Sequence, residues 1–243
     1  MNKLAKVAIV LSTSLGAMPS FAQDIYQIDY KGFSIWLDCE TKSAIGWKYI
    51  ARKDTGNYDR YDSFFRDPNL PSRCSQTSTK TYKTGKGEVK YHRGHLVPAN
   101  AMDYSDLTIK QSNIMTNVLP QVAQMNTGAW KETEVYVECR RDKYPVTVVG
   151  GVFAGNTPMN GDFKISHGIQ APEAFWKVAY SGNQAIAWWI PNSPLAKASM
   201  VDSYIVTPSE IESRIGRDID VPIFLKNKRA ASTNASTKYC KRS

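Results

Sequence analysis

The decapeptide Tyr91-His92-Arg93-Gly94-His95-Leu96-Val97-Pro98-Ala99-Asn100 holds two of the three histidines of the chain, with an arginine and a glycine between them. An imidazole titrates near neutral pH, so His95 can take a proton from water without large tuning of its pKa. Arg93 adds a permanent cation, and Gly94 permits close approach of the backbone. Because one side chain neutralises charge while another activates a nucleophile, this stretch predicts chemistry on a phosphate diester. A histidine bonded within a turn is the alternative.

The length and composition of the chain indicate one folded domain. The 243 residues suffice for a single core, and contents of 42% hydrophobic and 22% charged residues are ordinary for a globular protein. The net charge of +9 suits an anionic partner, such as nucleic acid, a polyanionic glycan or an anionic membrane surface.

Residues 1–22 are typical of a cleaved signal peptide. Lys3 and Lys6 begin it, a largely apolar run follows, and Ser20-Phe21-Ala22 forms a small-x-small cleavage site. The apolar run is shorter than the roughly 20 residues that span a bilayer. We therefore expect cleavage after Ala22 and a periplasmic or secreted protein with no membrane attachment. An uncleaved N-terminal anchor is the alternative.

The cysteines indicate disulfides rather than a zinc site. An even number of cysteines in an exported protein predicts two disulfides, and three pairings are possible. His92 and His95 are three residues apart, but a zinc site needs further ligands and the only other histidine is His167. The four cysteines are Cys39, Cys74, Cys139 and Cys240.

Hydrophobic periodicity predicts a protein rich in strands. A polar segment over 53–79, which carries Arg60, reads as a long loop. A short helix is expected to begin near Ser105, and another spans 208–215, with a capping box that begins at Thr207. Strands are expected over 23–40 with a break at Lys31-Gly32, over 44–52, over 145–153, and in a hairpin of 172–180 with 184–190.

A longer helix is expected over 122–139. Its apolar positions form one stripe at 100° per residue; Asn126 lies in this stripe and Glu134 at its border. A buried polar side chain without a partner is costly, and oxygen ligands suit hard cations such as Mg²⁺. The pattern is compatible with a cation site, and an ordinary polar helix face is the alternative.

Two motifs resemble a known family. Arg93-Gly94-His95 followed by Leu-Val-Pro-Ala resembles the DNA/RNA non-specific endonuclease family of ββα-metal nucleases, whose signature is Asp-Arg-Gly-His. Residues 116–121 and 125–130, followed by Glu134, are similar to the second motif of that family in order and spacing. Arg60 and the segment after it resemble an upstream arginine region. The resemblance runs from about residue 25 to 223.

The resemblance implies an α+β fold, in which a central antiparallel sheet is flanked by helices and the catalytic helix lies near residues 122–139. We expect a nuclease domain over 23–225 and a loose basic C-terminal tail over 226–243. In the family, both DNA and RNA are substrates, and cleavage leaves a 5′-phosphate.

The resemblance also implies roles for the residues that hold the proton and the cation. His95 would be the general base that activates water. Asn126 would be the one direct protein ligand of Mg²⁺, for which Mn²⁺ is a substitute. Glu134 would hold a metal-bound water from the second shell.

The arginines and one further asparagine would serve the substrate. By the resemblance, Arg93 and Arg60 contact the phosphate and stabilise charge in the transition state. Asn117 matches a family asparagine near the site, and we expect it to help bind substrate.

One residue departs from the signature: His92 stands where the family has aspartate. The replacement removes a negative charge near His95, so we expect it to change the pH optimum. A catalytically weakened protein that binds nucleic acid or another polyanion is therefore the main alternative. A phosphodiesterase or phosphatase for small substrates is a third reading.

Overall fold

The computed structural model describes residues 24–155 and 162–233, and the predicted signal peptide lies outside them. A seven-stranded antiparallel sheet forms the centre, in the order β1-β2-β3-β6-β9-β10-β11. This confirms the α+β fold with a central antiparallel sheet. The strands are β1 (Ile25–Asp29), β2 (Phe33–Asp38), β3 (Ser43–Ala51), β6 (Val146–Phe153), β9 (Ala174–Ser181), β10 (Gln184–Pro191) and β11 (Ile205–Val206).

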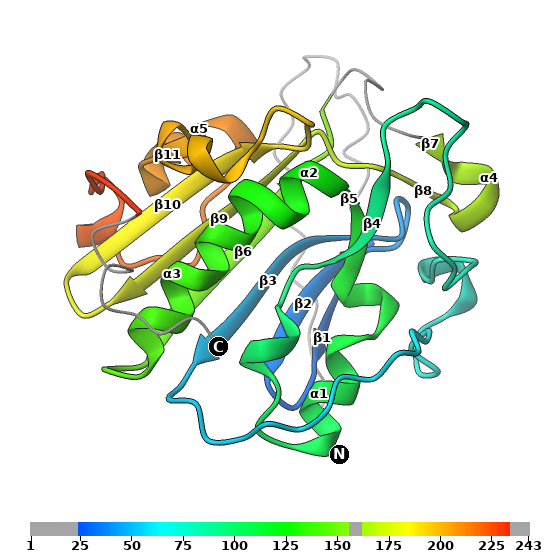
Figure 1. The fold of residues 1–243 in the computed structure, drawn as a ribbon, viewed down its shortest axis with the longest axis horizontal. Coiled ribbons are helices and arrows are strands. Elements are labelled where there is room, and N and C mark those ends of the chain that lie inside the picture. Colours follow the sequence, from blue (N-terminus) through cyan, green and yellow to red (C-terminus); the bar gives the residue numbers. More distant parts are fainter. Residues whose placement is uncertain (1–23, 156–161, 234–243) are drawn as a thin grey trace, which may run out of the picture.

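The sheet is covered on both faces, as the alternation along β9 shows. Phe175 packs into the larger apolar cluster, together with the helix of residues 123–141. Trp176 and Val178, which point the other way, pack with Ile211 of α5 (Pro208–Ile215) in a second cluster. Figure 1 shows the long helix crossing the sheet, with a separate two-stranded antiparallel sheet of β4 (Tyr91–His95) and β5 (Val118–Val122) beside it.

The predicted helix over 122–139 is present, but it is broken. It consists of α2 (Ala123–Met125), a π-helical turn (Asn126–Trp130) and α3 (Lys131–Arg141), with non-helical backbone angles at Gly128. The amide of Ala129 donates to the carbonyl oxygen of Ala196 (3.1 Å), and a Cβ at Gly128 would lie 2.8 Å from that oxygen. The close approach of this neighbouring segment explains the break, which 100° periodicity does not reveal.

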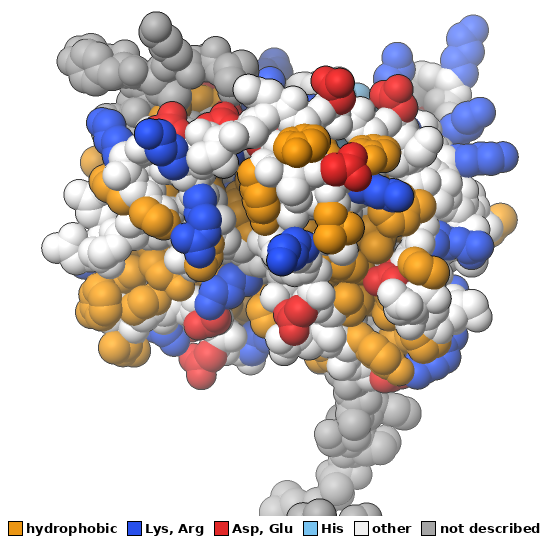
Figure 2. All heavy atoms as spheres, turned by 90° about the horizontal axis from the view of Figure 1, so that it is seen from below, with side chains coloured by type: hydrophobic (Ala, Val, Ile, Leu, Met, Phe, Trp, Pro, Cys, Tyr) orange, Lys and Arg blue, Asp and Glu red, His pale blue; other side chains and the backbone are white. Residues whose placement is uncertain are grey.

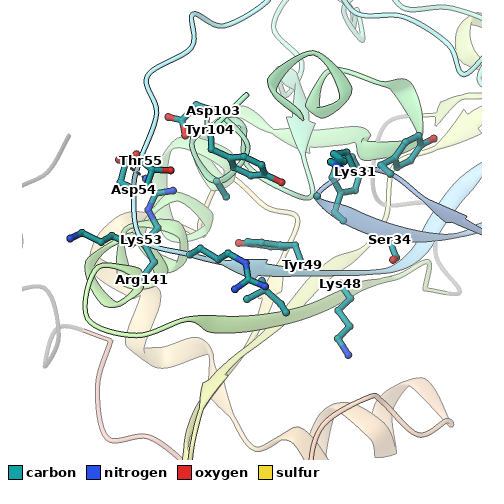
Figure 3. A pocket seen from close by; sticks show the side chains of 16 residues that line it. Lys31, Ser34, Lys48, Tyr49, Lys53, Asp54, Thr55, Asp103, Tyr104 and Arg141 are labelled. Atoms are coloured by element: carbon teal, nitrogen blue, oxygen red, sulfur yellow. Dashed lines mark hydrogen bonds and ion pairs between the residues drawn. The ribbon is translucent and has the colours of Figure 1, made fainter. Parts of the chain in front are cut away.

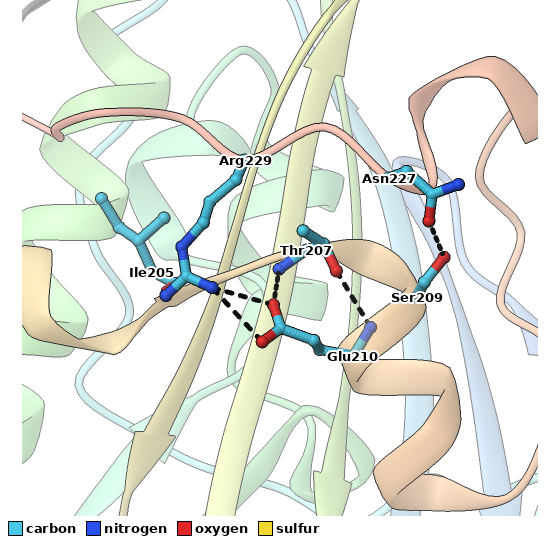
Figure 4. Close-up of polar contacts among 6 residues, drawn as sticks. All are labelled: Ile205, Thr207, Ser209, Glu210, Asn227 and Arg229. Carbon is cyan, nitrogen blue, oxygen red and sulfur yellow. Dashed lines mark hydrogen bonds and ion pairs between the residues drawn. The ribbon is translucent and has the colours of Figure 1, made fainter.

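The expected helix α5 has the predicted capping box. The hydroxyl of Thr207 accepts from the amide of Glu210 (3.1 Å), and the Glu210 carboxylate accepts from the amide of Thr207 (2.5 Å), as Figure 4 shows. Gly216 ends the helix in the left-handed conformation (φ 67°). A helix near Ser105 is confirmed as well: the Ser105 hydroxyl caps α1 (Asp106–Ser112).

The first part of the expected loose tail packs on the domain. Arg229 donates to the carbonyl oxygen of Ile205 and bonds the carboxylate of Glu210 (Figure 4). The Trp188 indole NH, buried in the sheet, donates to the hydroxyl of Thr233 (3.0 Å), which is itself buried. A buried indole NH needs an acceptor, and this explains why residues up to Thr233 are held; the rest of the tail lies outside the described residues.

Smaller elements complete the chain. Cys39 is bonded to Cys74, which selects one of the possible pairings; Cys139 is also disulfide-bonded, and Cys240 lies outside the described residues. In the described ranges, no helix is long and apolar enough to cross a membrane. The remaining elements are β7 (Asp162–Phe163), α4 (Lys164–His167), β8 (Ile169–Gln170) and 3-10 turns at Ser72–Cys74, Ala99–Ala101, Met115–Asn117, Ala198–Tyr204 and Ile223–Leu225.

Candidate active site

Strand β4 directs the two histidines of the motif to opposite faces. Successive side chains of a strand point to opposite faces. Arg93 and His95 both contact the ring of Phe64 on one face, whereas His92 reaches Asn126 on the other. The two histidines therefore do not form the paired ligand set that their spacing suggests.

Asn113 fixes the orientation and the tautomer of His95. The Nδ2 of Asn113 donates to the carbonyl oxygens of Tyr61 and Ser63. With its NH₂ group engaged there, the Oδ1 of Asn113 faces the Nε2 of His95 at 2.8 Å. A carbonyl oxygen only accepts, so Nε2 carries the proton and Nδ1 keeps the basic lone pair.

The surroundings of His95 keep its imidazole neutral. Burial lowers the pKa of His95 below its ordinary value. The hydrogen bond to Asn113 raises the pKa in part, and the positive charges of Arg60 and Arg93 lower it further. Desolvation and like charge both disfavour the imidazolium. The lowered pKa therefore favours the neutral imidazole at neutral pH, and among the described residues no partner occupies its Nδ1.

Arg93 is held in place rather than extended into solvent. Its Nη1 donates to the carbonyl oxygen of Thr79 (2.9 Å), and its guanidinium carbon lies 3.9 Å from the centroid of the Phe64 ring. The same ring is 5.5 Å from the imidazole of His95, centroid to centroid. Phe64 thus spaces the cation and the base, with a cation–π contact on one side.

Arg60 comes to the site from the long loop. Its guanidinium donates to the Oδ1 of Asn100, and the Nδ2 of Asn100 donates to Glu138 of α3 (3.2 Å). Its charge lowers the pKa of both His95 and Glu134. The fold therefore brings Arg60, Arg93, His95 and Glu134 into one electrostatic neighbourhood.

A buried lysine lies beneath Glu134. Burial raises the pKa of Glu134, and the positive charge of Lys177 opposes that rise. Lys177, on β9, is completely buried; its Nζ donates to the hydroxyl of Thr133 (2.9 Å) and lies 3.8 Å from the Trp130 ring centroid. Burial lowers the pKa of Lys177, and the two opposite charges stabilise each other.

Asn126 and Gln121 are oxygen donors suited to a hydrated cation. Asn126 begins the π-helical turn, and its carboxamide nitrogen is 3.1 Å from the Nδ1 of His92. Gln121 is completely buried, and within the described residues neither atom of its carboxamide has a hydrogen-bond partner. It lies directly against Gly94, where a Cβ would be 2.2 Å from the carboxamide carbon. A buried amide without partners fits a site that binds a cation with its water shell.

No cluster of acidic, histidine and cysteine ligands accompanies this site. Within 24–155 and 162–233, no three His, Cys, Asp or Glu side chains gather closely enough to hold a metal ion. A cation here would rest on amide oxygen and water, with Glu134 available to accept from a bound water.

Asn117 lies inside the domain and bonds backbone groups. It is completely buried: its Oδ1 accepts from the amide of Val97 (2.9 Å), and its Nδ2 donates to the carbonyl oxygens of Val97 (2.9 Å) and Ser112 (2.8 Å). Both polar atoms of its carboxamide thus bond backbone groups. Asn117 thereby links the segment that follows β4, at Val97, to the segment that precedes β5.

Sequence reasoning missed two residues that shape the site. Asn113 gives no signal in the sequence, because a polar residue at the end of a short helix is unremarkable and its contact with His95 is tertiary. Lys177 does give one: it is a lone lysine within the apolar strand Ala174–Ser181. A charge in a strand that is buried on both faces requires a partner.

A cavity of about 570 Å³ lies outside this cluster. It is bordered by β2, β3 and the residues after Ala101, and Figure 3 shows Asp54 and Asp103 at one end and Lys48 at the other. Its closest link to the site is Arg141, which pairs with Asp54 (2.7 Å) and donates to the carbonyl oxygen of Asn100 (2.6 Å). None of the predicted catalytic residues lines it.

The architecture is that of a ββα-metal nuclease. It combines the central antiparallel sheet, the two-stranded sheet β4–β5 that carries His95, and the helix of residues 123–141. The chain belongs to the DNA/RNA non-specific endonuclease family, whose model matches residues 16–223. The chain is accordingly a hydrolytic endonuclease.

The chain is similar to several known nucleases in sequence and in structure. A nuclease of Nostoc sp. is 25% identical over 87% of this chain and 80% of its own length. A nuclease of Serratia marcescens is 27% identical over 77% of this chain and 74% of its own length. Human mitochondrial endonuclease G is 27% identical over 75% of this chain, which spans 63% of that protein. A crystal structure of an EndoG/EndoGI complex superposes with a TM-score of 0.66 at 17% identity, covering 83% of this chain and 86% of that one, and confirms the fold.

Proposed function

We propose that this protein is an exported, Mg²⁺-dependent endonuclease that cleaves DNA and RNA without sequence preference and leaves 5′-phosphate ends. The observation that carries the proposal is the state of His95. Its Nε2 bonds Asn113, which leaves Nδ1 to serve as the base, and burial together with the charges of two arginines lowers the pKa of the ring. This is the arrangement that a water-activating general base needs at neutral pH.

The protein side chains divide the reaction between them. The Nδ1 of His95 removes the proton from the water that attacks phosphorus. Arg93 and Arg60 both lie close enough to lower the pKa of the imidazole by their charge, and they stabilise the added negative charge on the phosphoryl oxygens. Phe64 fixes the distance between the base and one of these cations, so base and phosphate are oriented together.

Asn126 would hold the Mg²⁺ directly, and Glu134 would bind one of its waters. A divalent cation supplies charge stabilisation at the leaving 3′ oxygen. Lys177 favours the ionised form of Glu134, which is the form that accepts hydrogen bonds from water. Mn²⁺ prefers the same oxygen donors and is expected to substitute.

Contacts limited to phosphate account for the absence of sequence preference. Groups that bind only phosphate and sugar carry no sequence information, and DNA and RNA share the diester. On the face seen in Figure 2, lysine and arginine side chains are scattered among hydrophobic and acidic ones. Affinity for the phosphate backbone is expected to come from the arginines of the site, added to the weak, salt-sensitive attraction of the net charge.

Export to the periplasm or the medium is supported by two independent features. Residues 1–22 have the tripartite pattern of a signal peptide. The disulfide between Cys39 and Cys74 suits an oxidising compartment.

Digestion of plasmid DNA and of RNA tests the proposal. We expect cleavage with Mg²⁺, none with EDTA, and a loss of about 10²-fold to 10⁴-fold in His95→Ala. Lys90→Ala, an exposed change beside β4, is the matched control and is expected to cleave normally. Substantial activity in a folded His95→Ala protein would overturn the assignment. Binding of DNA without cleavage by the unaltered protein would instead favour a non-catalytic polyanion-binding protein.

A further inference from the structure

We propose that His92 is a second protein ligand of the cation, and that it makes the site bind Ni²⁺ and Co²⁺ much more tightly than Mg²⁺. The inference rests on the proposed function, which places the cation at Asn126. His92 occupies the position of the aspartate in the family signature that this motif resembles, so the imidazole is a property of this chain rather than of that signature.

The distance between the two side chains fits shared coordination. The Nδ1 of His92 lies 3.1 Å from the carboxamide nitrogen of Asn126. Turning that carboxamide by 180° exchanges its nitrogen and oxygen at nearly the same positions, which sets Oδ1 opposite Nδ1. Two ligand atoms 3.1 Å apart, each about 2.1 Å from one ion, subtend an angle of about 95° at that ion. This is close to the right angle between neighbouring ligands of an octahedral site.

A cation can take the place of the proton that joins these two side chains. In the structure, the NH₂ group of Asn126 faces Nδ1 of His92 as a hydrogen-bond donor; with the carboxamide turned, Oδ1 and the lone pair of Nδ1 both point at the space between them, where a cation can bind both. His92 is exposed at its outer edge and pairs across the two-stranded sheet with Gln121, so an ion can reach it from solvent. The Gln121 carboxamide, buried without a partner among the described residues, lies on the same face and can bond a water of the ion.

The chemistry of the ligands predicts which ions the site binds more tightly. Mg²⁺ is selected by oxygen ligands, whereas imidazole suits the later first-row ions, whose affinities rise from Mn²⁺ through Co²⁺ to Ni²⁺. A nitrogen ligand in place of one water therefore favours Ni²⁺ and Co²⁺ over Mg²⁺. An aspartate at position 92 would favour Mg²⁺ instead, because it offers a charged oxygen.

Pulsed electron paramagnetic resonance of the Mn²⁺-loaded protein tests the ligand directly. A coordinated imidazole gives nitrogen modulation of the electron spin echo, which an amide oxygen does not. We expect this modulation in the unaltered protein and in His95→Ala, the matched removal of the other histidine of β4. We expect its loss in His92→Asp. Titration calorimetry should show that the ratio of Ni²⁺ to Mg²⁺ affinity falls at least tenfold in His92→Asp.

The outcomes separate this inference from the proposed function. If Mn²⁺ binds to one site that Asn126→Ala removes, but without nitrogen modulation, His92 is not a ligand and the cation site at Asn126 stands. If Asn126→Ala binds Mn²⁺ as tightly as the unaltered protein, the proposed cation site is itself wrong. Circular dichroism of each variant establishes that the fold is kept.

Discussion

The Oδ1 of Asn113 and the Nε2 of His95 meet at 2.8 Å, although 18 residues separate them. Backbone carbonyls of Tyr61 and Ser63 hold the NH₂ group of the same asparagine. The loop of residues 53–79 thus orients His95 indirectly, because it holds the carboxamide of Asn113. That carboxamide in turn sets which imidazole nitrogen carries the proton.

Asn113→Ala is expected to lower kcat about tenfold or more with little change in KM. Without the acceptor, the imidazole loses its fixed ring orientation and tautomer, which affects the chemical step rather than substrate binding. Steady-state cleavage of a fluorescent DNA substrate measures both constants. Ser63→Ala, which keeps the backbone carbonyl, is the control. A rise in KM alone would show that Asn113 serves binding instead.

The rate is expected to fall at acid pH with a midpoint below 6.5. Burial and the two arginines lower the pKa of His95, and the protonated ring cannot act as a base. Above that pKa the ring is neutral, so activity is present at higher pH and is lost as pH falls through it. The same shift stabilises the fold above pH 6.5, and that stabilisation is lost as pH falls through the folded pKa. In Asn113→Asp, a carboxylate beside Nε2 should move the acid limb to higher pH; an unchanged limb would contradict the assignment of the base.

Lys177→Met is expected to reduce activity at neutral pH by about tenfold and to be partly rescued at higher pH. The change keeps much of the buried volume but removes the cation that opposes the burial-raised pKa of Glu134. More of Glu134 is then protonated and unable to accept from water, until the pH rises. A pH–rate profile measures this. Lys143→Met is the matched control, because Lys143 is exposed and is not among the charges that act on Glu134. Equal effects of the two changes would rule out a special role for Lys177.

Thr207→Ala is expected to destabilise the protein by about 1 kcal/mol without changing kcat. It removes the capping hydroxyl at the start of α5, and a lost cap of this kind costs roughly 0.5–2 kcal/mol. Figure 4 shows the contact, together with the bond from Ser209 to Asn227, whose removal in Ser209→Ala serves as a control of small effect. Thermal unfolding measures the difference. A large loss of activity would imply that α5 communicates with the site.

Local patterns foretold the elements well. The strands of the central sheet other than β11, the turn at Lys31-Gly32 and the capping box of α5 depend on neighbouring residues, so periodicity and cap chemistry reveal them. Strand β4, the short strand β11 and the break at Gly128 were not predicted. They depend on segments that approach from elsewhere: β4 pairs with β5, β11 pairs with Ala187 and Trp188 of β10, and the amide of Ala129 donates to the carbonyl oxygen of Ala196.

By itself, the sequence determined the chemistry available to this protein: which residues can carry a proton, a phosphate or a cation, and in what order along the chain they lie. Residue types fix reactivity, and motif spacing fixes which of them share a strand or a helix. Only the tertiary structure decided how these groups act on one another. It tied His95 to Asn113, placed Lys177 beneath Glu134, buried Asn117 among backbone groups and brought His92 to Asn126. Each of these contacts joins segments far apart in the chain, and packing rather than local propensity sets its distance and its desolvation.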